Sequence, residues 1–133
     1  MILGLLIAAG TAFAATASLK LTGPSGTLKQ NQVWTATAYG TATKKATTLF
    51  AYEGGYVGSS HAAINCYSTA AAEHAAYGVS VLLGVYHVQG KFSKSWKRVA
   101  SNPGPRSFCA YLANKSGSDT YAAASLHWTN SST

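Results

Sequence analysis

The side chains that most often carry out catalysis are scarce in this sequence. The chain has only three carboxylates, which are Glu53, Glu73 and Asp119. Glycoside hydrolysis needs two carboxyl groups that face one substrate, and three isolated acidic residues make such a pair difficult to assemble. The local motifs of serine hydrolases, zinc proteases and phosphate-binding loops are absent from the sequence as well. The sequence therefore predicts a protein that is not an enzyme.

Histidines are the remaining candidates for metal chemistry. The chain has four of them, at positions 61, 74, 87 and 127, and no two are four residues apart. A zinc or copper site needs three or four ligands at one point, and this spacing gives no sign of one. Glu73 and His74 form the best local pair. We expect ordinary surface or core-edge histidines, with no metal and no cofactor.

The two cysteines, Cys66 and Cys109, are typical of a disulfide rather than of a metal site. No C-x-x-C motif occurs, and two cysteines without histidine ligands do not make a structural zinc site. An even pair in a small chain is typical of one disulfide formed in an oxidising compartment. Such a loop closure stabilises a fold by about 4 kcal/mol in the chain-entropy model. A bonded pair also leaves no free thiol for a Cys–His nucleophile.

The most informative surface feature is the basic run from Lys91 to Val99. Alternate residues of a strand point to opposite faces. One face therefore has Phe92, Lys94, Trp96 and Arg98, and the other has Lys91, Ser93, Ser95 and Lys97. Cations next to aromatic rings suit a sugar polymer that carries phosphate or carboxylate groups. The candidate ligand-binding residues are therefore Lys91, Lys94, Trp96, Lys97 and Arg98.

A second interpretation of the same run is favoured over the first. Lysines protect an exposed edge strand against pairing with another chain, and Phe92 and Trp96 would then lie in the core. The alternation of cations and rings also suits nucleic acid. A secreted protein seldom meets nucleic acid, which is therefore not the expected partner.

The beginning of the chain is typical of a secretory signal peptide. An uncharged apolar run from Met1 to Ala9 precedes the small-residue site Ala12-Phe13-Ala14. The run is too short to span a membrane, and the usual basic n-region is missing. We expect a signal peptide over residues 1–15 and a single domain over 16–133, which would be secreted and act outside the cell or at its surface. The alternative is a buried N-terminal strand or helix of a cytosolic domain.

Composition supports an extracellular β protein. Charged residues make up 10% of the chain, against about 25% in an average domain. Solubility must therefore depend on Ser, Thr, Asn and Gln. The formal net charge of +7 favours anionic polymers as partners. The alternative is that this charge only keeps the domain soluble.

Seven segments have the alternation or β-branched content of strands, and turn signals separate them. Between the third and fourth lies an Ala-rich helical pattern over Cys66–Tyr77, and the fourth segment, Val79–Val88, is apolar enough to predict a buried strand. The pattern predicts an all-β, antiparallel sandwich with a short inserted helix. The expected strands are Ser18–Thr22, Val33–Tyr39, Thr47–Tyr52, Val79–Val88, Lys91–Val99, Arg106–Ala113 and Thr120–Thr129.

Several short motifs resemble a class of secreted Ig-like domains from actinobacteria. They are Gln89–Lys94, Asn102-Pro103-Gly104, Phe108–Leu112 and Thr120–Ser125. In that class a Cys-Ala-Tyr-Leu strand pairs with a Cys that precedes an Ala- and Glu-containing segment. The resemblance thus implies a Cys66–Cys109 bond, an Ig-like sandwich and secretion, but no catalytic residue.

The match to true immunoglobulin domains is poorer. Those domains have a Tyr two residues before the second Cys, and Ser107 stands there in this chain. Antibody-like recognition is therefore not implied.

Three functions remain open from the sequence. The first is a non-enzymatic binding or adhesive module at the cell envelope, acting on an anionic cell-wall polymer or another surface protein. The second is a structural subunit of a surface assembly or filament, which would self-associate through sheet edges or donate the strand at residues 15–22. The third is a small basic secreted toxin, inhibitor or antimicrobial protein.

Overall fold

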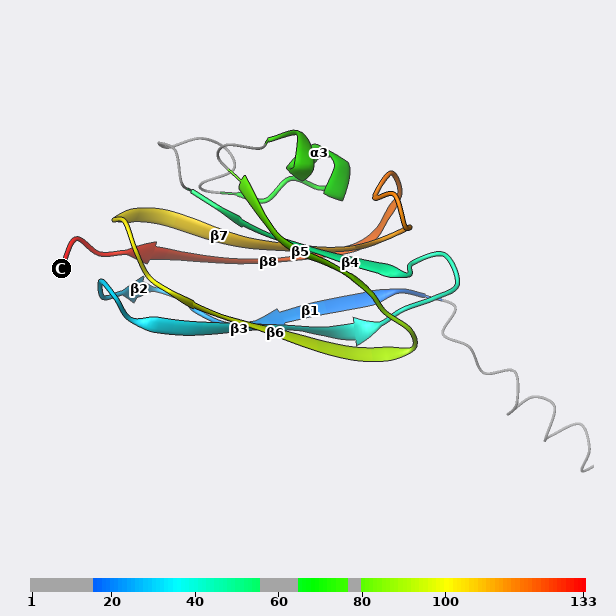
Figure 1. Ribbon diagram of the computed structural model, residues 1–133, viewed down its shortest axis with the longest axis horizontal. Helices are drawn as coiled ribbons and strands as arrows, with labels where there is room; N and C mark the ends of the chain where they lie inside the picture. The colour runs from blue at the N-terminus through cyan, green and yellow to red at the C-terminus, as the bar shows by residue number, and fades with distance from the viewer. Residues whose placement is uncertain (1–15, 56–64, 77–79) are drawn as a thin grey trace, which may run out of the picture.

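The protein is a sandwich of two β-sheets, as the computed structural model in Figure 1 shows. The structure describes residues 16–55, 65–76 and 80–133, so the expected signal peptide at residues 1–15 lies outside the described residues. The smaller sheet has the order β1-β3-β6, and the larger has the order β2-β8-β7-β4-β5. The all-β Ig-like sandwich with one short helix and one disulfide is confirmed.

Strand boundaries follow the expected segments closely. The strands of the smaller sheet are antiparallel neighbours: β1 (Ser18–Thr22), β3 (Val33–Thr41) and β6 (Lys91–Val99). The larger sheet contains β2 (Thr27–Leu28), β4 (Thr48–Gly54), β5 (Ser80–His87), β7 (Gly104–Ala113) and β8 (Thr120–Asn130).

The described chain has eight strands rather than the expected seven, because β2 was not foreseen. After β1 the chain crosses from the smaller sheet to the larger, and Gly26 makes the turn with a positive φ of 65°. The next two residues pair in parallel with β8, whereas the other strand pairs among the described residues are antiparallel. Buried Leu28 holds this contact. Two residues are too few to show any alternation in the sequence.

The strand predicted at Val79–Val88 is present as β5, but the prediction that it is buried is wrong. In the described chain β5 pairs only with β4 and is therefore an edge of the larger sheet. Val81, Leu82 and Val85 are 40%, 41% and 48% exposed. An apolar run predicts a strand, but it does not reveal whether that strand has a neighbour on both sides.

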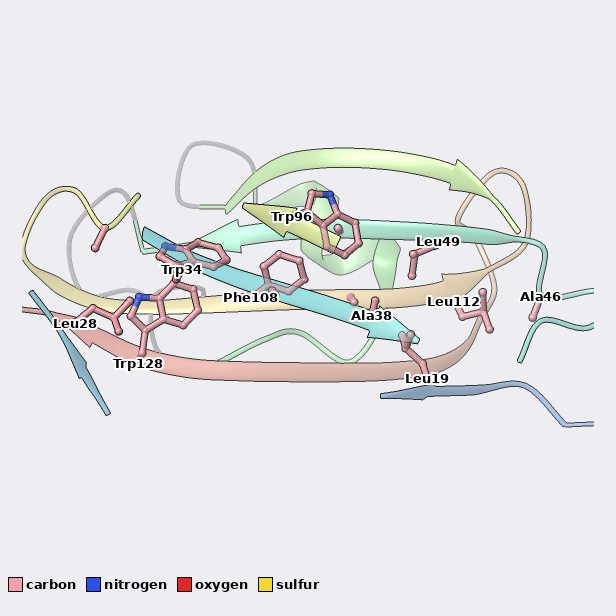
Figure 2. Packing of buried hydrophobic residues seen from close by; sticks show 14 residues of the cluster. Leu19, Leu28, Trp34, Ala38, Ala46, Leu49, Trp96, Phe108, Leu112 and Trp128 are labelled. Carbon is pink, nitrogen blue, oxygen red and sulfur yellow. The ribbon is translucent and has the colours of Figure 1, made fainter. Parts of the chain in front are cut away.

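The main core lies between the two sheets and is built around aromatic side chains (Figure 2). Trp34 of β3 lies 4.9 Å from Trp128 of β8 and 6.1 Å from Phe108 of β7, measured between ring centroids. Trp96 of β6 lies 5.1 Å from the same Phe108 ring. Small residues such as Ala36 and Ala38 alternate with these rings, so that the two sheets pack closely.

A second buried cluster covers the outer face of the larger sheet. Along β7, Phe108 and its alternate neighbours enter the main core, whereas Cys109 and Tyr111 face the other way and are also fully buried. The helix α3 (Ala70–Ala75) packs over that outer face (Figure 1). The Cys66–Cys109 disulfide ties the segment before the helix to β7, as predicted.

The helix is shorter than its sequence pattern. It begins after Thr69, whose side-chain oxygen accepts a hydrogen bond from Ala72 N–H. This is the standard way to satisfy a free N–H at a helix start, so the cap places the first turn after residue 69 rather than at Cys66.

Candidate functional site

The five candidate residues on β6 lie on two different faces of that strand. β6 is an edge strand of the smaller sheet and pairs with β3 along its whole length. Lys91 and Lys97 point outward, whereas Trp96 is buried in the main core and shares its face with Lys94 and Arg98. The favoured interpretation, an edge strand with lysines outside and aromatic rings inside, agrees with this placement.

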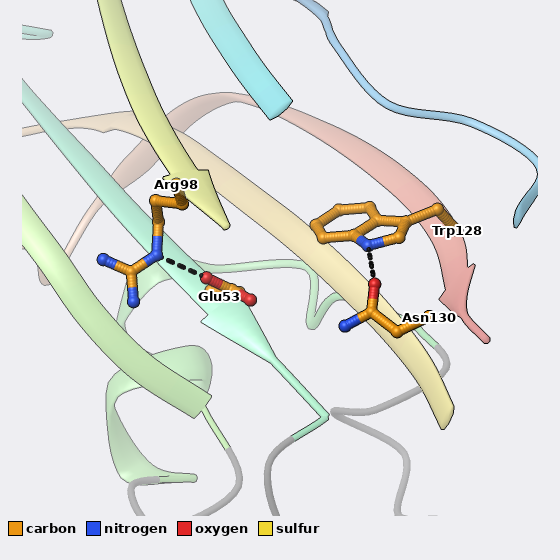
Figure 3. A network of polar contacts seen from close by, with 4 residues as sticks. All are labelled: Glu53, Arg98, Trp128 and Asn130. Carbon is orange, nitrogen blue, oxygen red and sulfur yellow. Dashed lines mark hydrogen bonds and ion pairs between the residues drawn. The ribbon is translucent and has the colours of Figure 1, made fainter. Parts of the chain in front are cut away.

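The two cations on the inward face have partners within the fold. Arg98 Nε lies 2.8 Å from Glu53 Oε1 across the two sheets (Figure 3), and the Glu53 side chain is only 5% exposed. Lys94 Nζ lies 4.2 Å from the ring centroid of Tyr86, whose hydroxyl accepts a hydrogen bond from Trp96 Nε1. Arg98 therefore balances a buried carboxylate and serves the fold. Figure 3 also shows the bond from Trp128 Nε1 to Asn130 Oδ1, which supports the core near the C-terminus.

The outward-facing side of the smaller sheet forms a second arrangement of cations. Its side chains lie in rows that cross the three strands, and we call it the lysine–hydroxyl face. One row contains Ser18, Thr41 and Lys91, the next Lys20, Tyr39 and Ser93, and the next Thr22, Thr37 and Ser95, with Thr35 and Lys97 beyond. The Thr37 and Ser95 hydroxyl oxygens are 2.8 Å apart, so within this row the neighbouring strands β3 and β6 are joined by a side-chain contact as well as by the backbone.

Tyr39 is the one aromatic ring on this face. It is 39% exposed, and it pairs with Lys20 on one side and with Ser93 on the other. A shallow hollow of about 340 Å³ lies beside it, lined by Ser18, Lys20, Tyr39, Gly40, Thr41, Lys91 and Phe92. None of the residues of β1, β3 or β6 is acidic, so the positive charge of the three lysines is not neutralised within the face.

Sequence reasoning found part of this face and missed the rest. It placed the outward direction of Lys91 and Lys97 correctly, but Lys20 and Tyr39 were not candidates. Their alternation with Leu19 and Ala38 showed that they face away from the core. Nothing in the sequence showed that β1, β3 and β6 are neighbours, which is what brings Lys20, Tyr39 and Lys91 together.

A second hollow lies on the outer face of the larger sheet. Its volume is about 390 Å³, and its lining is mostly apolar: Phe50, Tyr52, Ala70, Ala71, His74, Leu82, Val85, Ser116, Gly117 and Ser118. Gly117 has a φ of +79° and closes the turn directly over the Phe50 ring. No sequence motif indicated this hollow, because α3, β5 and the turn before β8 meet only in the fold.

Among the described residues, one group brings three metal-ligating side chains together. The ligand atoms of Cys66, Glu73 and Cys109 lie within 4.8 Å of one another. The two sulfurs form a disulfide, which lacks the thiolate charge that binds metal ions. The group therefore offers a single carboxylate. His74, His87 and His127 are exposed, and His61 lies outside the described residues.

Glu73 is fully buried and ties the helix to the sheet. Its Oε1 atom accepts a hydrogen bond from Tyr67 N–H at 3.0 Å and lies 2.7 Å from the donating hydroxyl of Tyr111. Burial, and then the contact with Glu73, raises the pKa of Tyr111 far above its usual value. Burial and the nearby Glu73 charge raise the pKa of Tyr52 as well. Glu73 and Tyr111 are fully buried, so these two groups act within the fold.

In the part of the chain that the structure describes, no helix is both long and apolar enough to cross a membrane.

The fold has counterparts among solved structures, although the sequence has none among family models or curated proteins. The CARDB domain of a Pyrococcus furiosus protein, solved with di-metal ions, is 9% identical with a TM-score of 0.50, over 86% of this chain and 92% of that one. A Niemann-Pick type C2 protein from the Japanese carpenter ant is 6% identical, with a TM-score of 0.45 over 90% and 96%. An AA10 lytic polysaccharide monooxygenase from Streptomyces lividans is 15% identical, with a TM-score of 0.43 over 80% and 59%. The likeness to the CARDB domain shows a shared β-sandwich fold and nothing further.

Proposed function

We propose that this protein is a non-enzymatic extracellular binding module whose lysine–hydroxyl face binds an anionic polysaccharide of the cell envelope. The observation that carries the proposal is the exposed Tyr39 ring between Lys20 and Lys91, on three strands without an acidic residue. A ring exposed in the middle of a sheet has apolar area that the fold leaves in water, and a ligand would cover it.

The chemistry of the face matches a charged sugar polymer. The C–H groups on the flat side of a sugar ring pack against an aromatic ring, which has a large apolar surface. The ammonium groups of the lysines pair with phosphate or carboxylate groups, and the rows of Ser and Thr accept and donate hydrogen bonds to sugar hydroxyls. Because neighbouring strands are about 4.8 Å apart and alternate residues roughly 6.8 Å apart, the face offers a regular array to an extended chain.

The extracellular setting rests on the disulfide. Disulfides persist in oxidising compartments and are rare in the cytosol. The Cys66–Cys109 bond joins the segment before α3 to the buried strand β7. The low fraction of charged residues and the formal net charge of +7 fit a domain that meets anionic polymers outside the cell.

A charge-matched pair of variants tests the proposed face. One replaces Lys20, Lys91 and Lys97 by Gln, and the control replaces three exposed lysines outside the face, Lys29, Lys45 and Lys115, by Gln. Both lose the same formal charge. We expect the first triple variant to bind purified anionic wall polymer at least about tenfold more weakly at low salt, which is 1.4 kcal/mol, while the control changes little.

A Tyr39→Ala variant separates stacking from charge. This variant should bind the polymer more weakly. It should not change how steeply the affinity falls as the salt concentration rises, because that dependence comes from the lysine charges. Equal weakening in the two triple variants would mean that net charge alone drives binding, and it would overturn the proposed face.

A further inference from the structure

The two open edges on one side of the sandwich are protected very differently. β6 carries four cations, Lys91, Lys94, Lys97 and Arg98, whereas β5 has no charged residue and no proline among Ser80–His87. Within the described residues β5 pairs only with β4, so the backbone N–H and C=O groups on its other side have no strand partner. Lysine, proline and inward charges are the usual devices that keep an edge from pairing. β5 lacks them all.

The outer side of this edge is apolar. Leu82 and Val85 are exposed there, and they lie opposite Tyr52 and Phe50 of β4 at the rim of the second hollow. Leu82 and Val85 are three residues apart and share this side because the β4–β5 register shifts between them. The side chains on the same side of a strand added to β5 would lie beside them. Apolar side chains at those positions would cover surface that the fold leaves in water.

The other side of the same edge is cationic. Lys94 Nζ lies over the Tyr86 ring, and Tyr86 folds back across Gly84, where a Cβ would overlap its hydroxyl. Further along, Val81 pairs with Glu53, which holds Arg98. Lys94 is exposed and its ammonium group lies over the Tyr86 ring, so an anion next to the edge would gain a charge pair.

We propose that β5 accepts, as an added strand, an extended segment of another protein in which acidic and apolar side chains alternate. The backbone of the segment would extend the larger sheet beyond β5, its apolar side chains would contact Leu82 and Val85, and its acidic side chains would approach Lys94. Strand addition of this kind draws affinity from main-chain hydrogen bonds and specificity from alternate side chains. The acceptor edge belongs to the larger sheet and does not depend on the lysine–hydroxyl face.

Two synthetic peptides as long as β5 test this proposal, one alternating Glu and Val and the other alternating Lys and Val. Fluorescence anisotropy with the labelled peptides should show binding of the Glu peptide and at least about tenfold weaker binding of the Lys peptide. A Lys94→Glu variant should reverse that preference. Amide hydrogen exchange of β5 should slow when the Glu peptide is bound.

Two double variants, one at the proposed edge and one as a control, test where the peptide binds. Leu82→Lys with Val85→Lys should abolish binding of the Glu peptide. The matched control is Val33→Lys with Val99→Lys, because these valines are 55% and 51% exposed on the opposite sheet and should have no effect. Thermal unfolding of both double variants establishes that they are folded.

Three results would overturn the proposal. One is equal affinity for the two peptides, and another is unchanged binding by the folded Leu82→Lys, Val85→Lys variant. The third is a dimer in sedimentation equilibrium that the same variant dissociates and the Glu peptide does not displace, since a second copy would then occupy the edge.

Discussion

At the scale of single residues, the buried carboxylate of Glu73 is central to the outer half of the fold. It accepts hydrogen bonds from Tyr67 N–H and from the Tyr111 hydroxyl, and so joins α3 to β7. Glu73→Ala removes both bonds from a fully buried position. We expect it to lower the free energy of unfolding by about 2–4 kcal/mol in urea titrations.

The conservative change tells this role apart from simple packing. Glu73→Gln keeps an oxygen at the Oε1 position, so it should cost clearly less than the Ala variant. If Gln and Ala destabilise the protein equally, the hydrogen bonds at Oε1 are not what holds the helix.

The two buried tyrosines should make the protein sensitive to high pH. The pKa values of Tyr52 and Tyr111 are raised in the fold, whereas an unfolded tyrosine titrates near 10. Above that pH the unfolded state releases protons that the native state keeps, so the stabilisation from these two tyrosines should be fully present below about pH 10 and decline above it. Urea unfolding as a function of pH measures this. A Tyr111→Phe variant should show a shallower decline, and an identical decline would contradict the assignment.

At the scale of elements, Gly40 controls how closely β1 approaches β3. A Cβ at this position would overlap the carbonyl oxygen of Ser18 and lie 2.7 Å from its carbonyl carbon. Both atoms belong to the backbone of β1, so the strand itself must move. We expect Gly40→Ala to lower stability by about 1–3 kcal/mol and to speed amide exchange in β1.

The same change should also weaken the proposed binding face, because β1 carries Lys20. The control is Ser125→Ala, an exposed position on β8 of the larger sheet, outside the lysine–hydroxyl face. A Gly40→Ala protein with unchanged stability and unchanged exchange in β1 would show that the close approach is not needed.

The disulfide also acts between elements, because it links the segment before α3 to β7. It closes a loop with a sequence separation of 43 residues. Replacing Cys66 or Cys109 by Ser should lower the free energy of unfolding by about 2–5 kcal/mol. Wild-type protein under reducing conditions should unfold at the same denaturant concentration as the variants. Two free thiols in the intact mass of the purified, unreduced protein would refute the bond.

Element types could be predicted from the sequence more reliably than element neighbours. Alternation in Val33–Tyr39 gave the buried face of β3, and the alanines at helical spacing indicated α3. The apolar content of β5 suggested burial, yet its position at an edge leaves Val85 exposed. Trp96 was a candidate ligand residue and lies in the core, whereas Lys20 and Tyr39 became candidates only once sheet order placed them beside Lys91.

At the scale of the whole molecule, the two sheets present different chemistry to the surroundings. The smaller sheet exposes lysines and hydroxyls, and the larger exposes an apolar edge and hollow. Because exposed charges are screened within about 10 Å at 0.1 M salt, polymer binding to the smaller sheet should weaken as salt rises, while apolar contacts at β5 should not. Affinity for anionic wall polymer at a series of salt concentrations measures the first of these effects, and affinity that does not change with salt would contradict it.

The most direct test of the proposed binding face is a residue-by-residue map of where the polymer contacts the protein. Amide chemical shifts are followed while short fragments of an anionic wall polysaccharide are added to the labelled protein. We predict that the largest changes fall on Lys20, Tyr39 and Lys91 and their neighbours in β1, β3 and β6. Changes confined to β5, α3 or the turn before β8, with the lysine–hydroxyl face unperturbed, would contradict the proposed function.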